Sequence, residues 1–257
     1  MSPWNPDLYL KFEQERTQPI HDLVSRIHAD DPKAVVDLGC GPGNSTRVLR
    51  DRWPSADLLG VDNSTEMIEK ARETFPQEQW LLADIRTWRP EQRYDVIFSG
   101  ATLQWLPDHR KLMPRLFSYV GDGGVFAVQL PANRESPLHQ ALLEISRGPE
   151  WRTFVAGCEE LIVYQTPEFY YDVLSALSSN VQMWTTTYYH VLTDHRELLE
   201  WYSSTGLRPY LERLPDESRR DAFQREILKA CAESYPEQDD GRILYPFQRF
   251  FFIVRKT

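Results

Sequence analysis

The sequence predicts an α/β fold in which a mostly parallel sheet carries helices on both faces. Apolar stretches of strand length alternate with amphipathic stretches of helix length, and a glycine-rich turn joins the first strand to the helix after it. Such alternation is typical of parallel sheets covered by crossover helices. With 257 residues, the chain is long enough for one large domain with an elaborated cap.

The elements of the first half follow in regular order. A short apolar strand is expected at residues 34–38, and residues 45–52, behind the glycine turn, are expected to form a helix. Further strands are predicted at residues 58–61, 80–83, 94–98 and 125–130, with helices at residues 64–75 and 109–120. Repeated strand–helix–strand units of this kind build a parallel sheet.

The rhythm changes after residue 131. Helices are predicted at residues 137–146 and 167–177, and a long strand rich in Thr, Tyr and Val is predicted at residues 181–192. The following stretch is helical in pattern, and the chain closes with a strand at residues 247–255. A hairpin between this strand and the long one before it would let the sheet end antiparallel.

These patterns suggest how one domain over residues 1–257 is organised. We expect a helical segment at residues 1–30 that lies over the site and a ligand-binding half at residues 31–135. Residues 194–235 are expected to form a helical cap, inserted before the last strand.

Composition and charge exclude several classes of protein. The formal net charge of -9 disfavours a nucleic-acid partner, because phosphate binding depends on clustered Lys and Arg. The three cysteines are widely spaced, which argues against a disulfide framework and a metal site. No apolar run reaches the length of a membrane span, and the first ten residues lack the pattern of a signal peptide. We therefore expect a cytoplasmic protein without a metal, a membrane partner or an obligate protein partner.

The glycine turn predicts the kind of ligand that this fold binds. Asp37 ends the first strand, and Gly39, Gly41 and Gly43 follow at alternate positions, where missing side chains let a ligand approach the backbone. The third glycine of the dinucleotide fingerprint is absent, because Asn44 occupies its position. An acid at this place would repel a pyrophosphate, whereas it would attract the cationic end of an amino-acid-like group.

Other strand ends carry polar or small residues at the edge where open α/β sheets bind ligands. Asp62 ends the second strand about 20 to 25 residues after Asp37, which is the sequence separation expected of a carboxylate that binds ribose hydroxyls. The further candidates for the ligand site are Asn44, Asn63, Met67, Asp84, Ile85, Ser99 and Gly100. Each acid alone could be a helix cap, and Met67 could be plain core. Combined with the glycine turn, however, they favour a ligand site.

This set of residues resembles the class I methyltransferases. Their first motif, an acid followed by alternating glycines, matches Asp37 to Gly43. The resemblance implies S-adenosylmethionine as cofactor and a Rossmann-like fold, with a seven-stranded sheet whose last strand is antiparallel. It also implies that Asp62 holds the ribose, that Asp84 and Ile85 contact the adenine edge, and that residues 99–103 line the methionine part.

Three further segments, at residues 4–10, 103–109 and 205–209, resemble a branch of this family that methylates one carboxylate of a small tricarboxylate. This second resemblance spans essentially the whole chain, and the substrate class rests on it alone. Three alternatives remain: the same chemistry on another small carboxylic acid or a phenol, a nicotinamide-dependent oxidoreductase, and a non-catalytic cofactor-binding module. The missing third glycine and Asp37 argue against the oxidoreductase.

A carboxylate acceptor sets simple chemical demands. It is ionised at neutral pH, with a reference pKa near 4, so we expect no catalytic residue and a mechanism based on orientation. The acceptor's charges need cationic partners, and arginine meets a carboxylate with two parallel N–H groups. The candidate arginines are Arg16, Arg134 and Arg208. Gln104, Trp105, Gln129 and Tyr188 are expected to add hydrogen bonds or apolar walls to the acceptor site.

Overall fold

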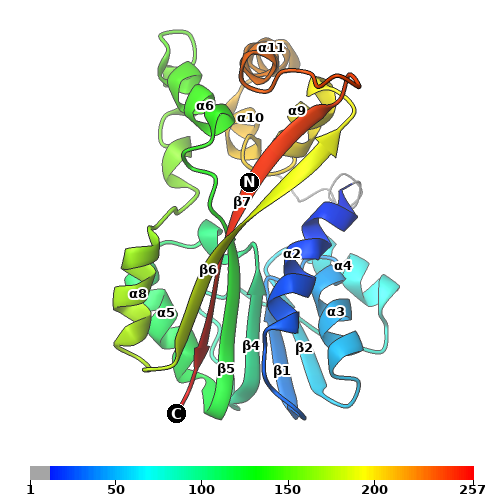
Figure 1. The fold of residues 1–257 in the computed structure, drawn as a ribbon, viewed down its shortest axis with the longest axis vertical. Coiled ribbons are helices and arrows are strands. Elements are labelled where there is room, and N and C mark those ends of the chain that lie inside the picture. The colour runs from blue at the N-terminus through cyan, green and yellow to red at the C-terminus, as the bar shows by residue number, and fades with distance from the viewer. Residues whose placement is uncertain (1–11) are drawn as a thin grey trace. The chain divides into compact units, whose positions relative to one another are not determined.

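The computed structural model describes residues 12–257 and contains one seven-stranded sheet (Figure 1). Its strands are β1 (Ala34–Leu38), β2 (Asp57–Asp62), β3 (Gln79–Leu82), β4 (Tyr94–Gly100), β5 (Val120–Pro131), β6 (Val181–Leu192) and β7 (Ile243–Arg255). They lie in the order β3-β2-β1-β4-β5-β7-β6. The first five strands pair in parallel and β7 runs antiparallel to β5, which confirms the predicted fold class.

The chain divides into two compact units. Of the described residues, the sheet unit contains 12–131, 165–185 and 249–257, and the cap unit contains 132–164 and 186–248. The cap unit includes the whole predicted cap and adds residues 132–164, 186–193 and 236–248, which the sequence pattern did not assign to it. The assignment of the full chain to a single domain stays a prediction.

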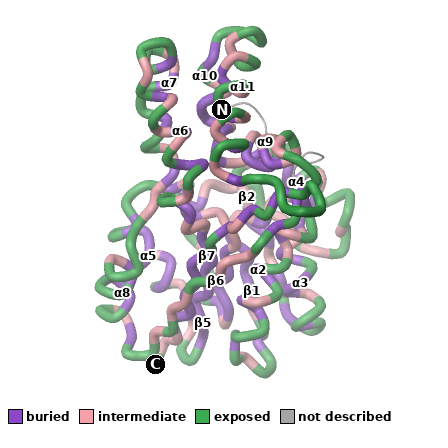
Figure 2. Tube along the Cα trace, turned by 45° about the horizontal axis from the view of Figure 1, so that its top comes forward, coloured by how far each residue is buried: buried purple, intermediate pink, exposed green. Residues whose placement is uncertain are grey.

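The helices of the sheet unit are α2 (Glu13–Ser25), α3 (Asn44–Arg52), α4 (Thr65–Thr74), α5 (His109–Ser118) and α8 (Pro167–Ser175). Figure 1 shows α2 and α3 on one side of the sheet and α5 and α8 on the other. On the second side, the ring of Tyr170 from α8 stacks on Phe250 of β7, with centroids 5.2 Å apart. Because helices cover both faces, the central strands are largely apolar, and β1 and β4 are buried nearly throughout. Figure 2 shows the exposed residues mainly on the outer helices and turns.

Helices α6 (Pro137–Arg147), α7 (Arg152–Val155), α9 (His195–Ser203), α10 (Arg208–Arg213) and α11 (Glu217–Ser234) belong to the cap unit. Helix α11 packs against α6 and α9. Asp194 and Asp216 begin α9 and α11 by accepting hydrogen bonds from backbone N–H groups of the first turn, as expected of N-cap residues. In the core of the cap unit, the rings of Trp151 and Phe223 pack edge to face, with their centroids 5.0 Å apart. The predicted helical character of residues 194–235 is thus confirmed.

Two features are absent from the described part of the chain. Between residues 12 and 257, no helix has the length and apolar character to cross a membrane. The same residues contain no group of three or more His, Cys, Asp or Glu side chains arranged to hold a metal ion.

Candidate functional site

The glycine turn connects β1 to α3 in a conformation that needs glycine. Gly39, Gly41 and Gly43 have φ angles of +77°, +53° and +100°. A Cβ added to Gly39 would lie 2.1 Å from the side chain of Thr102, so the two segments approach as closely as glycine allows. At Gly41, by contrast, an added Cβ would have no neighbour within 4 Å among residues 12–257. The backbone at Gly41 therefore faces open space that a ligand can fill.

Asp37 lies at the end of β1 and is fully buried. Its Oδ2 accepts hydrogen bonds from the hydroxyls of Ser45 and Thr46, at 2.6 and 2.7 Å. Its Oδ1 has no hydrogen-bond partner among residues 12–257. Burial raises the pKa of Asp37 to about 6, while the two hydroxyl hydrogen bonds oppose this shift. A buried carboxylate oxygen of this kind fits a cationic N–H group of a ligand.

Sequence reasoning missed the two hydroxyl residues that hold Asp37. Ser45 and Thr46 lie in the first turn of α3, directly behind the glycine turn. Hydroxyl side chains at a helix start usually cap that helix, and this expectation conceals a role toward the preceding strand. The available signal was their place at the start of the helix that packs on the end of β1.

Asp62 links the end of β2 to the glycine turn. Its Oδ2 accepts from the backbone N–H of Gly41 at 3.0 Å, and its Oδ1 accepts from that of Ser64 at 2.9 Å. Burial raises the pKa of Asp62, and these backbone hydrogen bonds oppose the rise. Asn63 beside it is exposed, whereas Met67 in the first turn of α4 is buried. The structure therefore brings Asp37, Gly41 and Asp62 together as predicted.

The third-strand acid has a partner of its own in the structure. Arg86 donates from two guanidinium nitrogens to the carboxylate of Asp84, and this hydrogen bonding lowers the pKa of Asp84. The neighbouring Ile85 is buried, and its carbonyl accepts from Arg115 at 2.6 Å. The roles of Asp84 and Ile85 toward an adenine ring remain predictions.

Ser99 and Gly100 end β4 beside the glycine turn. The hydroxyl of Ser99 is buried and donates to the carbonyl of Leu38 at 2.8 Å, which ties β4 to β1. A Cβ added to Gly100 would lie 3.6 Å from Cγ1 of Ile20, so α2 passes over this strand end.

Helix α2 also reaches the glycine turn, because Asn44 Nδ2 donates to Glu13 Oε1 at 2.8 Å. Part of the segment predicted to be helical at residues 1–30 thus contacts the residue that follows the glycine turn. Residues 1–11 of that segment lie outside the described residues.

Two acceptor candidates of the sheet unit, Gln104 and Gln129, contact the turn after β4. Gln104 donates from Nε2 to the carbonyl of Ala101 at 2.6 Å, while Ala101 donates its N–H to the carbonyl of Gln129 at 2.9 Å. Gln129 Oε1 in turn accepts from Arg249 Nη1 at 3.4 Å. Arg16, Gln104 and Gln129 are buried, and Trp105 is half-buried.

The remaining candidates belong to the cap unit. Arg208 begins α10, and its Nε lies 2.8 Å from Oε1 of Glu212, with both side chains largely buried. Arg134 is exposed in the stretch between β5 and α6, and Tyr188 is half-buried on β6. The structure thus gives Arg208 an ion-pair partner within its own helix. A part for these three residues in acceptor binding remains a prediction.

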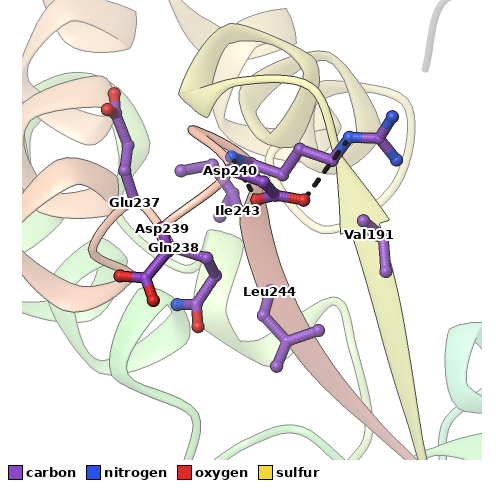
Figure 3. A pocket seen from close by; sticks show the side chains of 8 residues that line it. Val191, Glu237, Gln238, Asp239, Asp240, Ile243 and Leu244 are labelled. Atoms are coloured by element: carbon purple, nitrogen blue, oxygen red, sulfur yellow. Dashed lines mark hydrogen bonds and ion pairs between the residues drawn. The ribbon is translucent and has the colours of Figure 1, made fainter.

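A pocket of the cap unit, with a volume of about 460 Å³, lies beside the start of β7 (Figure 3). It is lined by Val191, Glu237, Gln238, Asp239, Asp240, Arg242, Ile243 and Leu244, and none of the predicted site residues is among them. Arg242 donates its backbone N–H to Asp240 Oδ1 at 3.0 Å, and its Nε lies 3.9 Å from Asp240 Oδ2. Dashed lines in Figure 3 mark these interactions of Asp240. Three carboxylates against one guanidinium make this pocket a poor host for an acidic ligand.

Comparisons with known proteins agree with this geometry. A family model described as a methyltransferase domain matches residues 12–213. The chain is 43% identical over 254 residues to the trans-aconitate 2-methyltransferase of Azoarcus sp. (strain BH72), covering 99% of both chains. It is 43% identical over 257 residues to the enzyme of the same name from Shigella flexneri, covering 100% of both. The chain belongs to the trans-aconitate 2-methyltransferase family.

The fold of this family member is that of the wider group of methyltransferases. The structure of coclaurine N-methyltransferase, bound to N-methylheliamine and S-adenosylhomocysteine, matches with a TM-score of 0.58. The match covers 94% of this chain and 72% of that one, at 17% sequence identity. This likeness confirms the class I methyltransferase fold that the motifs predicted.

Proposed function

We propose that the protein transfers the methyl group of S-adenosylmethionine to one carboxylate of trans-aconitate, giving a monomethyl ester and S-adenosylhomocysteine. The observation that carries this proposal is the 43% identity to trans-aconitate 2-methyltransferases over the full length of the chain. A cytoplasmic location and a small-molecule substrate, rather than a macromolecular one, belong to the same proposal.

The geometry of the glycine turn supports the cofactor assignment. Asp37 Oδ1 is a buried acceptor without a hydrogen-bond partner among the described residues, which suits the ammonium group of the cofactor's methionine part. The open backbone at Gly41 leaves room for the ligand, and the carboxylate of Asp62 beside it suits the two ribose hydroxyls. The other residues assigned to the cofactor are Gly39, Asn44, Asn63, Met67, Asp84, Ile85, Ser99 and Gly100.

The chemistry assigned to the acceptor needs no proton transfer by the protein. When bound, S-adenosylmethionine supplies a methyl group that is activated by the sulfonium charge. The acceptor carboxylate is already a nucleophile at neutral pH, so the chain's residues have to bind and orient it. Arginine side chains neutralise the other two carboxylates, whose burial without partners would be prohibitive. Orientation of this kind accounts for roughly 7–11 kcal/mol of a barrier.

An acceptor panel separates this proposal from its main alternative, another small carboxylic acid or a phenol. The purified protein is incubated with methyl-labelled S-adenosylmethionine and, in turn, trans-aconitate, cis-aconitate, citrate, single dicarboxylates and simple phenols. We expect the highest kcat/KM for trans-aconitate. A higher value for any other acceptor would replace the proposed substrate, and no transfer to any of them would favour a non-catalytic binding module.

A further inference from the structure

One arginine near the predicted acceptor residues was assigned no role by the sequence patterns. Arg249 lies on β7, in the middle of a nearly continuous apolar stretch, and only 5% of its surface is exposed. A guanidinium buried in a sheet is costly unless it has a specific purpose or partner.

The strand register places Arg249 on the same face of the sheet as Gln129. Arg249 pairs with Pro131, two residues beyond Gln129 on β5, and residues two apart on a strand share a face. Its Nη1 donates to Gln129 Oε1 across this diagonal at 3.4 Å. The two side chains therefore lie together at the carboxyl end of β5.

Helix α2 covers this same face. Gln129 pairs with Gly100 on β4, and Gly100 approaches Ile20 of α2. Arg16 lies four residues before Ile20, so it projects from the same side of the helix, and it is buried. Two buried guanidinium groups thus belong to the side of the sheet on which Gln129 lies.

The polar groups around Arg249 leave a donor available. Gln129 is 1% exposed, and its Nε2 has no hydrogen-bond partner among the described residues. Its Oε1 accepts from Arg249, so Nε2 of the same amide lies beside the guanidinium group. A buried set that offers N–H donors and positive charge is complementary to a carboxylate.

We propose that Arg249 and Gln129 form a subsite that binds one of the acceptor carboxylates that is not methylated. The inference rests on the proposed function and makes Arg249 a specificity-determining residue. The guanidinium supplies the charge and Gln129 Nε2 a further donor, while the hydrogen bond between them fixes the guanidinium. The place of the subsite, beside the ends of β4 and β5, is next to the strand ends assigned to the methionine part of the cofactor.

The test compares Arg249→Lys with the wild type in steady-state kinetics on trans-aconitate. Lysine keeps the charge but loses the planar fork, so we expect KM to rise at least about tenfold while kcat changes by less than about threefold. The dissociation constant of S-adenosylhomocysteine should stay within about twofold. Arg225→Lys, at an exposed position of α11, is the matched control and should match the wild type in all three values.

A second readout distinguishes carboxylate binding from a structural role. Itaconate, glutaconate and mesaconate each lack a different carboxylate of trans-aconitate. For the analogue that lacks the carboxylate bound by Arg249, wild type and Arg249→Lys should have kcat/KM values within about twofold of each other. A general structural defect would instead lower the values for all acceptors alike and would overturn the inference.

The outcomes separate this inference from the proposed function. Wild-type protein that forms no ester of trans-aconitate overturns the proposed function and the subsite with it. Wild-type turnover together with an unchanged Arg249→Lys variant overturns the subsite alone. If Arg249→Lys does not bind S-adenosylhomocysteine, Gln129→Met serves as the second variant. A KM for trans-aconitate that rises about fivefold, together with an unchanged KM for one of the three analogues, supports the subsite. An unchanged KM in that variant contradicts it.

Discussion

The carboxylate of Asp37 lies at the end of β1 without contact to solvent, and two hydroxyl groups of α3 hold one of its oxygens. Burial raises its pKa to about 6, well within reach of ordinary buffers. A cationic ligand group beside it favours the ionised form, so binding and ionisation are linked.

The affinity for S-adenosylhomocysteine should consequently depend on pH. Above about pH 7 Asp37 is ionised before binding, and the affinity is constant. Below about pH 6 a proton must leave on binding, so the affinity should fall by up to about tenfold for each pH unit. Calorimetry between pH 5 and 8 measures this slope. Asp37→Asn should bind more weakly and with a shallower slope, because an amide at this position carries no charge at any pH.

An affinity that is equal at pH 5 and pH 8 would show that the ammonium group of the ligand does not lie beside Asp37.

At the scale of elements, the turn between β1 and α3 depends on glycine for two separate reasons. Gly39 has a positive φ angle, and its Cα faces the side chain of Thr102. Gly123, in the first half of β5, has a similar φ of +73°, but no described residue lies within 4 Å of an added Cβ. Substitutions at the two glycines therefore distinguish the cost of backbone strain alone from that of strain combined with a steric clash.

Gly123→Ala should destabilise the protein by about 1–2 kcal/mol, the cost of the left-handed conformation alone. Gly39→Ala should cost at least about 2 kcal/mol more, because Thr102 or the turn must shift, and it should also weaken S-adenosylhomocysteine binding. Chemical denaturation and calorimetry of the two variants test this difference. Equal destabilisation of both would mean that the contact between the turn and Thr102 is not tight.

Helix α10 of the cap unit carries Arg208, a candidate for binding the acceptor. Its Nε pairs with Glu212 within α10, so the guanidinium is held in a fixed position on this helix. We predict that Arg208→Lys lowers kcat/KM for trans-aconitate by at least about tenfold and leaves cofactor affinity unchanged. Arg213→Lys, at the exposed far end of the same helix, is the control. Wild-type kinetics of Arg208→Lys would assign Arg208 to the stability of α10 alone.

Most element positions followed from apolar periodicity, and the exceptions have identifiable causes. Strand β5 begins at Val120, five residues before its predicted start, because the glycines in between lack the apolar pattern of a strand. Strand β7 begins at Ile243 and not at residue 247, since Pro246 interrupts the pattern that marks a strand. In both cases pairing within the sheet outweighs local propensity.

For the site, the strand-end acids and the alternating glycines were sufficient to predict that Asp37, Gly41 and Asp62 meet. The contacts that hold them were not predictable, since they depend on the packing of α3 and of Thr102 onto the strand ends. Arg249 was not predicted as a site residue, because one charged residue within an apolar strand resembles an outward-facing position until the strand register is known.

At the scale of the whole molecule, charge opposes the proposed substrate. A protein with a net charge of -9 repels a trianion, so binding depends on a local concentration of arginine. Because no side chain has to lose a proton, the rate of the chemical step at saturating cofactor and acceptor should be flat between about pH 6 and 9. Rapid-quench measurements across that range test this, and a bell-shaped profile would reveal a general base.

The central claim is the identity of the reaction, and the product tests it most directly. The purified protein, S-adenosylmethionine and trans-aconitate are incubated, and the products are identified by mass spectrometry and NMR. We predict a monomethyl ester of trans-aconitate, with one S-adenosylhomocysteine formed for each ester. Formation of S-adenosylhomocysteine without the ester, or no turnover at all, would contradict the assignment of trans-aconitate as the substrate.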